Sequence, residues 1–256
     1  MSSPLTISVV TAVFNRRGTI ADALESVLSQ RHPLVETIIV DGGSQDGTLD
    51  VLEEYRPRLA KMVSERDDGI YDALNKGIRM SSGDVVGFLH ADDLFADDEA
   101  LSRVAAAFAD PTVDAVYGDL VYVQKENVDR IVRLWRAGTF TRASLRRGWM
   151  PPHPTFYVRR SVYEKLGGFD TRYRIAADYD CMLRFLFAAR IKVTYVPAIM
   201  VRMRVGGVSN GSLGNMVRKS SEDYRIVRAN AVGGLATVIL KTTRKLHQFW
   251  HRERVG

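Results

Sequence analysis

The chain has 256 residues, of which 46% are hydrophobic and 26% are charged, as in ordinary globular proteins. These values exclude a disordered chain, a collagen-like fibre and a coiled coil. The single cysteine, Cys181, excludes an internal disulfide bond and fits a reducing compartment. The first residues show no signal-peptide pattern, and no apolar window is long enough to cross a bilayer. We therefore expect a cytoplasmic protein.

The first half of the sequence alternates apolar, β-branched segments with amphipathic ones. This alternation predicts an α/β fold whose mainly parallel sheet is covered by helices on both faces. The strands are expected at residues 5–13, 35–40, 60–64 and 85–89, and the helices at 18–30, 48–55, 70–80 and 99–108. Ligands of such sheets bind beyond the carboxyl ends of the strands. Residues 11–15, 41–47 and 90–93 follow three of these ends and are therefore the expected site.

The second half is less regular. Its patterns predict strands at 115–123, 131–135, 155–158 and 192–196, and helices at 178–189, 215–229 and 235–250. A loop rich in Gly, Ser and Asn covers residues 206–214. No repeat and no low-complexity segment interrupts the chain.

The basic charge lies at the end of the chain. The net charge is +6, and residues 215–256 hold nine basic and three acidic residues, which leaves the rest neutral. A basic tail suggests an acidic partner, either nucleic acid or an anionic membrane. Residues 229–240 are free of charge but too few to span a bilayer. The following helix mixes basic and apolar residues, which suits an interfacial position on anionic lipid: Lys241, Arg244, Lys245, Leu246, Phe249 and Trp250. The alternative is a helix that packs on the body or on a partner.

The turn at residues 41–47 follows an apolar strand. Its glycines allow a ligand to approach the backbone closely, and Asp41 offers a carboxylate to a base N–H or to ribose hydroxyls. The structural alternative is a tight turn in which Asp46 caps the next helix. The chain has no GxGxxG motif and no Walker A lysine, so neither dinucleotide nor P-loop binding is supported.

Two adjacent carboxylates, Asp92 and Asp93, follow the strand at 85–89. Such carboxylates repel each other unless one takes a proton or a cation lies beside them. Mg²⁺ and Mn²⁺ bind carboxylates and complete their shell with phosphate oxygens, so the pair indicates a metal–diphosphate site. The alternative is an exposed acidic turn.

Further residues in three segments are candidates from their placement. Asp178 lies at the start of a helix, on its apolar face, where it could act as a general base or as an N-cap. Asp68 opens the helix at 70–80 as a candidate N-cap, and Tyr71 and Asn75 lie one turn apart on that helix. His153 lies between prolines in an extended loop, where it could contact a phosphate or an acceptor hydroxyl.

The order and spacing of these segments resemble the family 2 glycosyltransferases over residues 6–209. The resemblance is carried by residues 8–15 (SVVTAVFN), 40–48 (VDGGSQDGT), 68–77 (DGIYDALNKG), 83–93 (GDVVGFLHADD), 117–119, 167–170 (GGFD) and 177–184 (ADYDCMLR). The form with DGIYDALNKG and a Pro-His loop is similar to bacterial enzymes that build cell-surface polysaccharides and glycolipids.

The resemblance implies a GT-A fold and inverting transfer from a nucleoside-diphosphate sugar, by default a UDP-sugar. Residues 1–210 would form the transferase domain, with a donor half (1–110) and an acceptor half (111–210), and residues 211–256 a basic helical extension. The implied acceptor is a glycan or a lipid-linked sugar. The implied partners also include an anionic membrane surface at the inner face of the cytoplasmic membrane, and no nucleic acid.

The resemblance also implies roles for single residues. Asp178 matches the catalytic base, and Asp92 and Asp93 match the metal-binding element for Mn²⁺ or Mg²⁺. The matching donor-binding residues are Thr11, Phe14, Asn15, Asp41, Asp68, Asn75, Lys76 and Asp92. His153 and Ser209 match positions near the acceptor or the diphosphate.

Two departures from the family pattern affect this assignment. His90 stands where an acidic residue is common, and Ala177 stands where the base is often preceded by Glu. The alternatives are a nucleotidyltransferase, which would also need a metal and strand-end carboxylates, and a non-catalytic scaffold that binds nucleic acid or membrane through its basic tail.

Overall fold

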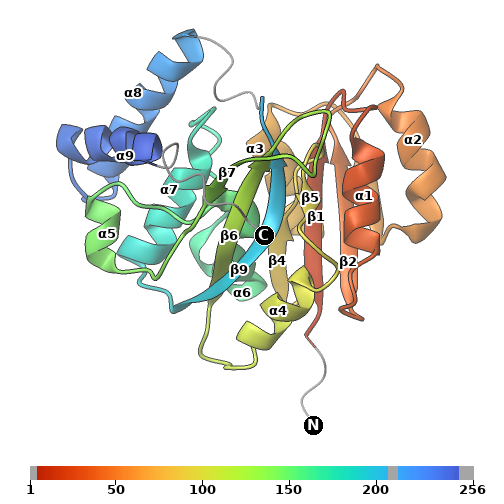
Figure 1. Ribbon diagram of the computed structural model, residues 1–256, viewed down its shortest axis with the longest axis horizontal. Coiled ribbons are helices and arrows are strands. Elements are labelled where there is room, and N and C mark those ends of the chain that lie inside the picture. The colour runs from red at the N-terminus through yellow and green to blue at the C-terminus, as the bar shows by residue number, and fades with distance from the viewer. Residues whose placement is uncertain (1–4, 207–212, 248–256) are drawn as a thin grey trace.

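The computed structural model describes residues 5–206 and 213–247. A central sheet lies between layers of helices, and a helical hairpin from the end of the chain covers one flank (Figure 1). The first half of the chain forms the side that carries α1 and α2, and the second half forms the opposite side. The four long strands of the first half begin near the N-terminus of the molecule and end at the top of the view.

The predicted elements of the first half all form, with bounds within about two residues of the prediction. They are β1 (Ile7–Val13), α1 (Ile20–Leu28), β2 (Val35–Asp41), α2 (Thr48–Tyr55), η1 (Arg56–Arg58), β3 (Lys61–Ser64), α3 (Ile70–Met80), β4 (Val85–Phe88), β5 (Leu94–Phe95) and α4 (Ala100–Ala107). The short 3-10 turn η1 and the two-residue strand β5 were not predicted, because neither is long enough to show a period.

Helix α3 lies directly on β1, which is buried along its whole length. A Cβ atom added to Gly77 would lie 2.2 Å from Cγ1 of Val10, so only glycine permits this approach. The close contact fixes where the first turn of α3 lies over the ends of the strands.

The second half differs more from the prediction. Its elements are β6 (Ala115–Val123), β7 (Ile131–Trp135), α5 (Arg142–Arg146), η2 (His153–Thr155), β8 (Tyr157–Arg159), α6 (Arg160–Leu166), α7 (Ala177–Leu183), the π-helical turn η3 (Arg184–Ala188) and β9 (Val193–Arg204). The helix predicted at 178–189 is thus α7 followed by η3. The last strand is much longer than predicted, since it pairs with β6 as far as the partners Val123 and Arg204.

The strands within residues 5–206 and 213–247 form one nine-stranded sheet in the order β3-β2-β1-β4-β8-β6-β9-β5, with β7 paired to β6. Strands β3, β2, β1 and β4 are parallel neighbours. Strand β8 is antiparallel to both β4 and β6, and β9 is parallel to β6, so β6 and β9 run in the same direction as β1. The predicted α/β class with a mainly parallel sheet is confirmed.

The end of the chain forms a helical hairpin of α8 (Leu213–Ala229) and α9 (Leu235–His247), which confirms the predicted helices up to residue 247. One face of the hairpin packs on the body: Ile226, Val227, Val232 and Val238 join the core cluster that contains α7. None of the helices in the described part of the chain is long and apolar enough to cross a membrane.

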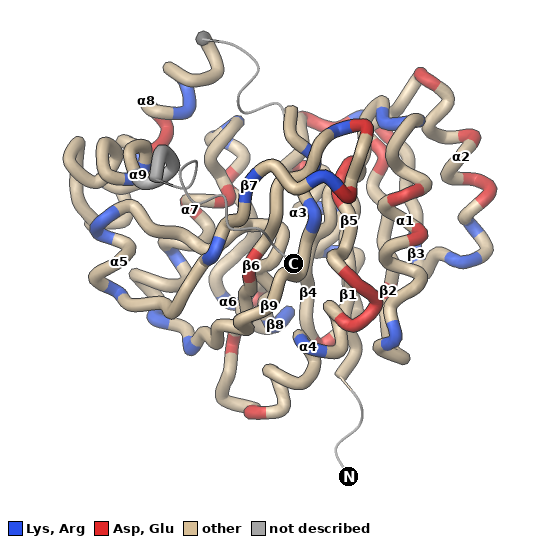
Figure 2. The backbone as a smooth tube through the Cα atoms, in the orientation of Figure 1, with Lys and Arg blue, Asp and Glu red and all other residues tan. Residues whose placement is uncertain are grey.

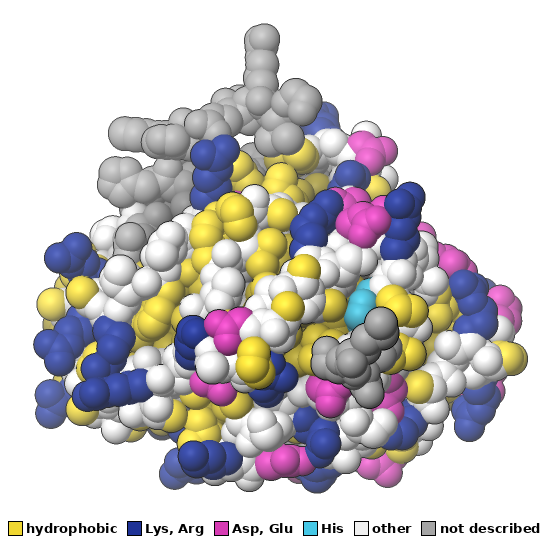
Figure 3. Space-filling view, turned by 90° about the horizontal axis from the view of Figure 1, so that it is seen from below, with side chains coloured by type: hydrophobic (Ala, Val, Ile, Leu, Met, Phe, Trp, Pro, Cys, Tyr) yellow, Lys and Arg dark blue, Asp and Glu magenta, His cyan; other side chains and the backbone are white. Residues whose placement is uncertain are grey.

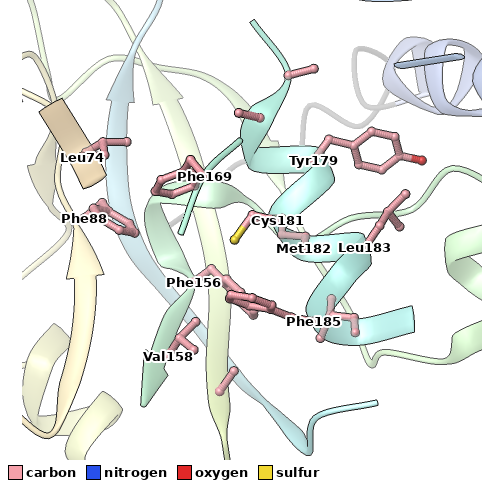
Figure 4. Packing of buried hydrophobic residues seen from close by; sticks show 14 of the residues in the cluster. Leu74, Phe88, Phe156, Val158, Phe169, Tyr179, Cys181, Met182, Leu183 and Phe185 are labelled. Carbon is pink, nitrogen blue, oxygen red and sulfur yellow. The ribbon is translucent and has the colours of Figure 1, made fainter. Parts of the chain in front are cut away.

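Buried aromatic residues pack against α7. In Figure 4 the side chain of Cys181 points toward Phe169, whereas Tyr179 points the other way, toward the hairpin. Burial raises the pKa of the Cys181 thiol to about 12, so this cysteine is a core residue rather than a nucleophile. The packing on both sides of α7 sets the position of its first turn, where Asp178 lies.

Candidate active site

Three turns meet at the carboxyl edge of β1, β2 and β4, as the sequence predicts. The loops at this end of the sheet carry both acidic and basic residues (Figure 2). Asn15 joins the first two turns, since its backbone N–H donates to Oγ of Ser44 (2.8 Å) and its Oδ1 accepts from the backbone N–H of Gln45 (2.9 Å). Its φ of 50° is a left-handed conformation that asparagine tolerates better than most residues. Asn15 therefore shapes the edge of the predicted donor site.

Asp41 is fully buried at the end of β2. Its Oδ2 accepts from the backbone N–H groups of Gly43 and Ser44, both at 3.0 Å, and from Oγ of Ser64 at 2.6 Å. Gly43 adopts a φ of +81°, which this turn requires. Asp46 also has a structural role, because its Oδ1 accepts from the backbone N–H of Thr48 at the start of α2 (3.0 Å).

The side chains expected to hold the base differ in exposure. Phe14 is 56% exposed directly after β1, so its ring is accessible for stacking. Thr11 is buried, and its Oγ1 lacks a hydrogen-bond partner among the described residues. Base recognition by Thr11, Phe14 and Asp41 stays a prediction.

The turn after β4 separates its two carboxylates. Asp92 is half-exposed, with Nε of Arg16 3.8 Å from its Oδ2. Asp93 is buried, and its Oδ1 accepts from the backbone N–H of Arg204 (3.1 Å). The buried Arg204 guanidinium holds this turn by donating to the backbone oxygen of Asp92 (2.9 Å) and to the carboxylate of Asp22 (2.6 Å). The end of β9 thereby fixes the acidic turn.

Asp92 and Asp93 fit a divalent cation. Within residues 5–206 and 213–247, three or more metal-binding side chains do not cluster, so a cation would depend on these two carboxylates. Oδ2 of Asp93 is buried without a hydrogen-bond partner in the described residues, and burial raises the pKa of this carboxyl well above its usual range. A buried carboxylate oxygen in this state is stabilised by a cation.

Asp178, in the first turn of α7, contacts Tyr71 of α3. The hydroxyl group of Tyr71 lies 2.9 Å from the backbone oxygen of Ile175 and 3.2 Å from Oδ1 of Asp178, and it donates to this pair of acceptors. The N-cap of α7 is Ala176, so the alternative that Asp178 is the N-cap is wrong. Asp178 is partly exposed, which leaves its carboxylate accessible to an acceptor.

Two histidines lie between the base candidate and the acidic turn. The ring centroids of His90 and His153 are 5.7 Å apart, and His153 also packs on Phe88 and Phe169. Burial lowers the pKa of His90 and lowers that of His153 to about 4, although the charge of Asp178 acts on both in the opposite direction. Both rings are therefore neutral at pH 7, and Nε2 of His153 is buried without a partner among the described residues.

Two predicted donor residues lie on α3 in structural contacts, and a third, Asp68, precedes the helix. Asn75 exchanges two hydrogen bonds with the backbone of Phe169 (2.8 and 2.9 Å), and Lys76 pairs with Glu65 (2.9 Å). Asp68 is exposed, and the N-cap of α3 is Gly69, so the capping alternative for Asp68 is wrong. Roles of these residues in donor binding stay predictions. Ser209 lies outside the described residues.

The sequence did not indicate that Tyr71 contacts the base candidate, Asp178, or that Arg204 holds the turn with Asp92 and Asp93. Tyr71 lies within the DGIYDALNKG segment, so its position in that motif was an available signal. Arg204 had no such signal, since the pairing of β9 with β5, the short strand that follows the turn, brings it there.

The sequence profile described as Glycosyl transferase family 2 matches residues 8–171, more than half of the chain. The chain belongs to glycosyl transferase family 2. This assignment replaces the nucleotidyltransferase and scaffold alternatives, and the protein is a glycosyltransferase.

Curated relatives of this glycosyltransferase carry the same activity in their names. A PGL/p-HBAD biosynthesis glycosyltransferase of Mycobacterium bovis is 29% identical over 215 residues, which cover 82% of this chain and 81% of the relative. An uncharacterized glycosyltransferase of Mycobacterium tuberculosis is 33% identical over 189 residues, which cover 72% of this chain and 70% of the relative.

Solved structures confirm the predicted GT-A fold. TarS 1-349 from S. aureus has a TM-score of 0.67 at 20% identity; the match covers 89% of this chain but only 65% of that chain. The mannosyltransferase PcManGT from Pyrobaculum calidifontis, solved with GDP-Man and Mn²⁺, has a TM-score of 0.66 at 22% identity, covering 96% of this chain and 71% of that chain.

Proposed function

We propose that this glycosyltransferase moves a sugar, with inversion, from a UDP-sugar to a hydroxyl group of a cell-envelope glycan or glycolipid. Solved structures with the same fold support a nucleotide-sugar donor, since TarS was solved with UDP and with UDP-GlcNAc and PcManGT with GDP-Man. The carboxyl edge of β1, β2 and β4 is the place for that donor in this chain.

The observation that carries the proposal is a continuous run of ring contacts between the base candidate and the acidic turn. Tyr71, which contacts Asp178, packs on Phe169, and Phe169 packs on His153. His153 in turn packs on His90, which lies two residues before Asp92. A donor diphosphate at Asp92 would therefore place its sugar near Asp178. This is the arrangement that a single displacement at the anomeric carbon needs.

Asp178 acts as the general base in this mechanism. Its carboxylate takes the proton of the acceptor hydroxyl while the acceptor oxygen bonds to the anomeric carbon and the bond to the diphosphate breaks. Tyr71 orients the carboxylate, and the neutral rings of His90 and His153 add no competing positive charge beside it. A divalent cation held by Asp92 and Asp93 would supply positive charge to the leaving diphosphate.

The exposed face of the hairpin supports a lipid-linked acceptor. Several of its large apolar residues are exposed: Met216, Val217, Tyr224, Leu235, Ile239 and Leu240. Arg218, Arg225 and Arg228 are exposed on the same helices. Basic residues also gather along the edge of the molecule where α5 lies, seen at the left of Figure 3, and Arg142, Arg146 and Arg147 are exposed there. Apolar and basic side chains side by side suit an anionic membrane surface.

Liposome flotation tests this surface with point substitutions. A truncation before α8 would be unsuitable, because the inner face of the hairpin belongs to the core. We expect the double variant Val217→Ser with Leu235→Ser to float with anionic vesicles less than the unchanged protein does. Neutral vesicles should bind both proteins weakly. Equal binding of this variant and the unchanged protein would contradict the membrane role.

The test of the catalytic proposal is Asp178→Asn. We expect transfer to fall by roughly 10²- to 10⁴-fold, the contribution of a general base, while calorimetry with UDP and Mn²⁺ shows unchanged donor binding. Asp98→Asn is the matched control, because Asp98 is an exposed carboxylate paired with Arg31, beyond the end of α1. Transfer that survives Asp178→Asn would exclude Asp178 as the base.

A further inference from the structure

A carboxylate from the C-terminal hairpin holds the chain just before the catalytic helix. Oε1 of Glu222, on α8, accepts from the backbone N–H of Arg174 (3.0 Å), and Oε2 accepts from those of Ile175 (2.9 Å) and Ala176 (3.0 Å). Glu222 is 2% exposed, so these bonds are shielded from water. Hydrogen bonds to a buried carboxylate are among the stronger ones in proteins.

Glu222 holds the segment that leads into α7 from outside the helix. The N-cap of α7 is Ala176, whose methyl group cannot accept a hydrogen bond, so the start of the helix has no side-chain cap of the usual kind. Glu222 accepts instead from the N–H of this N-cap residue and from those of the two residues before it. It does so although it lies 46 positions later in the chain than Ala176.

The same peptide segment is held from its other side. Ile175 donates its N–H to Glu222, and its backbone oxygen accepts from Tyr71, which also contacts Asp178. Glu222 and Tyr71 thus fix the peptide that leads into Asp178 from two different helices. Neither group lies on α7 itself.

We propose that Glu222 is a positioning residue for the catalytic base and that the C-terminal hairpin is therefore part of the catalytic apparatus. The proposal rests on the assignment of Asp178 as the base. Glu222 acts through the backbone of 174–176, which determines where α7 begins and where its second residue, Asp178, points. The bonds of Glu222 reach none of the turns after β1, β2 and β4, where the donor is expected, so we expect donor affinity to change little. The nearest link to a predicted donor residue is the side chain of Arg174, which donates to the backbone oxygen of Asp68 (2.9 Å).

The hairpin is anchored well enough to serve this purpose. Asp223, next to Glu222, forms a buried ion pair with Lys241 of α9, and Nδ2 of Asn230 donates to Asp180 of α7 (3.1 Å). Oγ1 of Thr237 donates to the backbone oxygen of Arg146 on α5 (3.0 Å). This last bond ties the hairpin to the body without touching residues 174–178.

The test is Glu222→Gln, with Thr237→Val as the matched control on the same hairpin. Glutamine keeps the shape but turns an NH₂ group toward the three backbone N–H groups, so at least one loses its acceptor. We expect kcat to fall by roughly 10- to 100-fold, as a small misplacement of a catalytic group does, with unchanged KM for the donor and unchanged UDP affinity. Glu222→Asp, which keeps the charge on a shorter side chain, should lose less.

Hydrogen–deuterium exchange supplies a readout that does not depend on which residue is the base. Amides 174–178 should exchange faster in Glu222→Gln and at the normal rate in Thr237→Val. The proposal is overturned if kcat changes by less than about twofold, if exchange is unchanged, or if Thr237→Val loses as much activity. Transfer that survives Asp178→Asn, with the exchange result intact, would show instead that the base assignment is at fault.

Discussion

The strongest stability prediction concerns the buried ion pair of the hairpin. Nζ of Lys241 lies 2.6 Å from Oδ1 of Asp223, and the two side chains are 5% and 4% exposed. The ammonium group also lies 3.3 Å from the centroid of the Tyr179 ring on α7. The substitution Asp223→Asn removes the only negative charge of this pair and leaves the buried ammonium group uncompensated.

The expected cost follows from the burial of both partners. Breaking a buried ion pair from one side costs about 3–5 kcal/mol, because the remaining charge has lost its hydration without a counter-ion. The contact with Tyr179 stays and offsets about 0.5–2 kcal/mol of this penalty. We therefore expect Asp223→Asn to destabilise the hairpin by about 1–4.5 kcal/mol.

Chemical denaturation and limited proteolysis measure this effect. If the hairpin unfolds before the body, protease cleavage in α8 or α9 rises while the main unfolding transition moves little. The double variant Asp223→Leu with Lys241→Met replaces both charges by apolar groups and should recover most of the lost stability. A double variant as unstable as Asp223→Asn would refute the reasoning, since the cost would then lie in packing and not in an unpaired charge.

Two further predictions concern acid stability and metal binding. The pKa of His153 in the folded state is about 4, below the ordinary histidine pKa of 6.5. The unfolded state therefore takes up the proton first, and stability is lost as pH falls from about 6.5 to 4. Denaturation of His153→Phe should therefore show about 3 kcal/mol less loss between pH 7 and pH 4, and an equal loss would contradict a buried neutral imidazole. Asp92→Asn should weaken Mn²⁺-dependent UDP binding by at least about tenfold in calorimetry, with Asp98→Asn unchanged. Chelation with EDTA should then change UDP binding by Asp92→Asn very little. Strong metal-dependent UDP binding by this variant would show that Asp92 is not a metal ligand.

The local patterns of the sequence determined much of the fold and part of the site. The periods of the apolar residues predicted every element of the first half except the short η1 and β5, because period is a property of neighbours along the chain. The four-residue spacing of Asp180 and Arg184 on one helix is that of an ion pair, and the pair forms at 2.8 Å. The placement of residues 11–15, 41–47 and 90–93 at one edge followed from the rule that parallel strands end together.

Tertiary structure alone decided how the base is held and how the hairpin is used. Tyr71 and Asp178 are 107 residues apart, and they meet because the sheet places β8 between β4 and β6. The side chain of Glu222 reads in sequence as an ordinary charge on a basic helix, and nothing near it in the chain indicates three backbone donors at 174–176. Local periodicity specifies which face of a helix is apolar, but the partner of that face depends on the order in which distant segments pack.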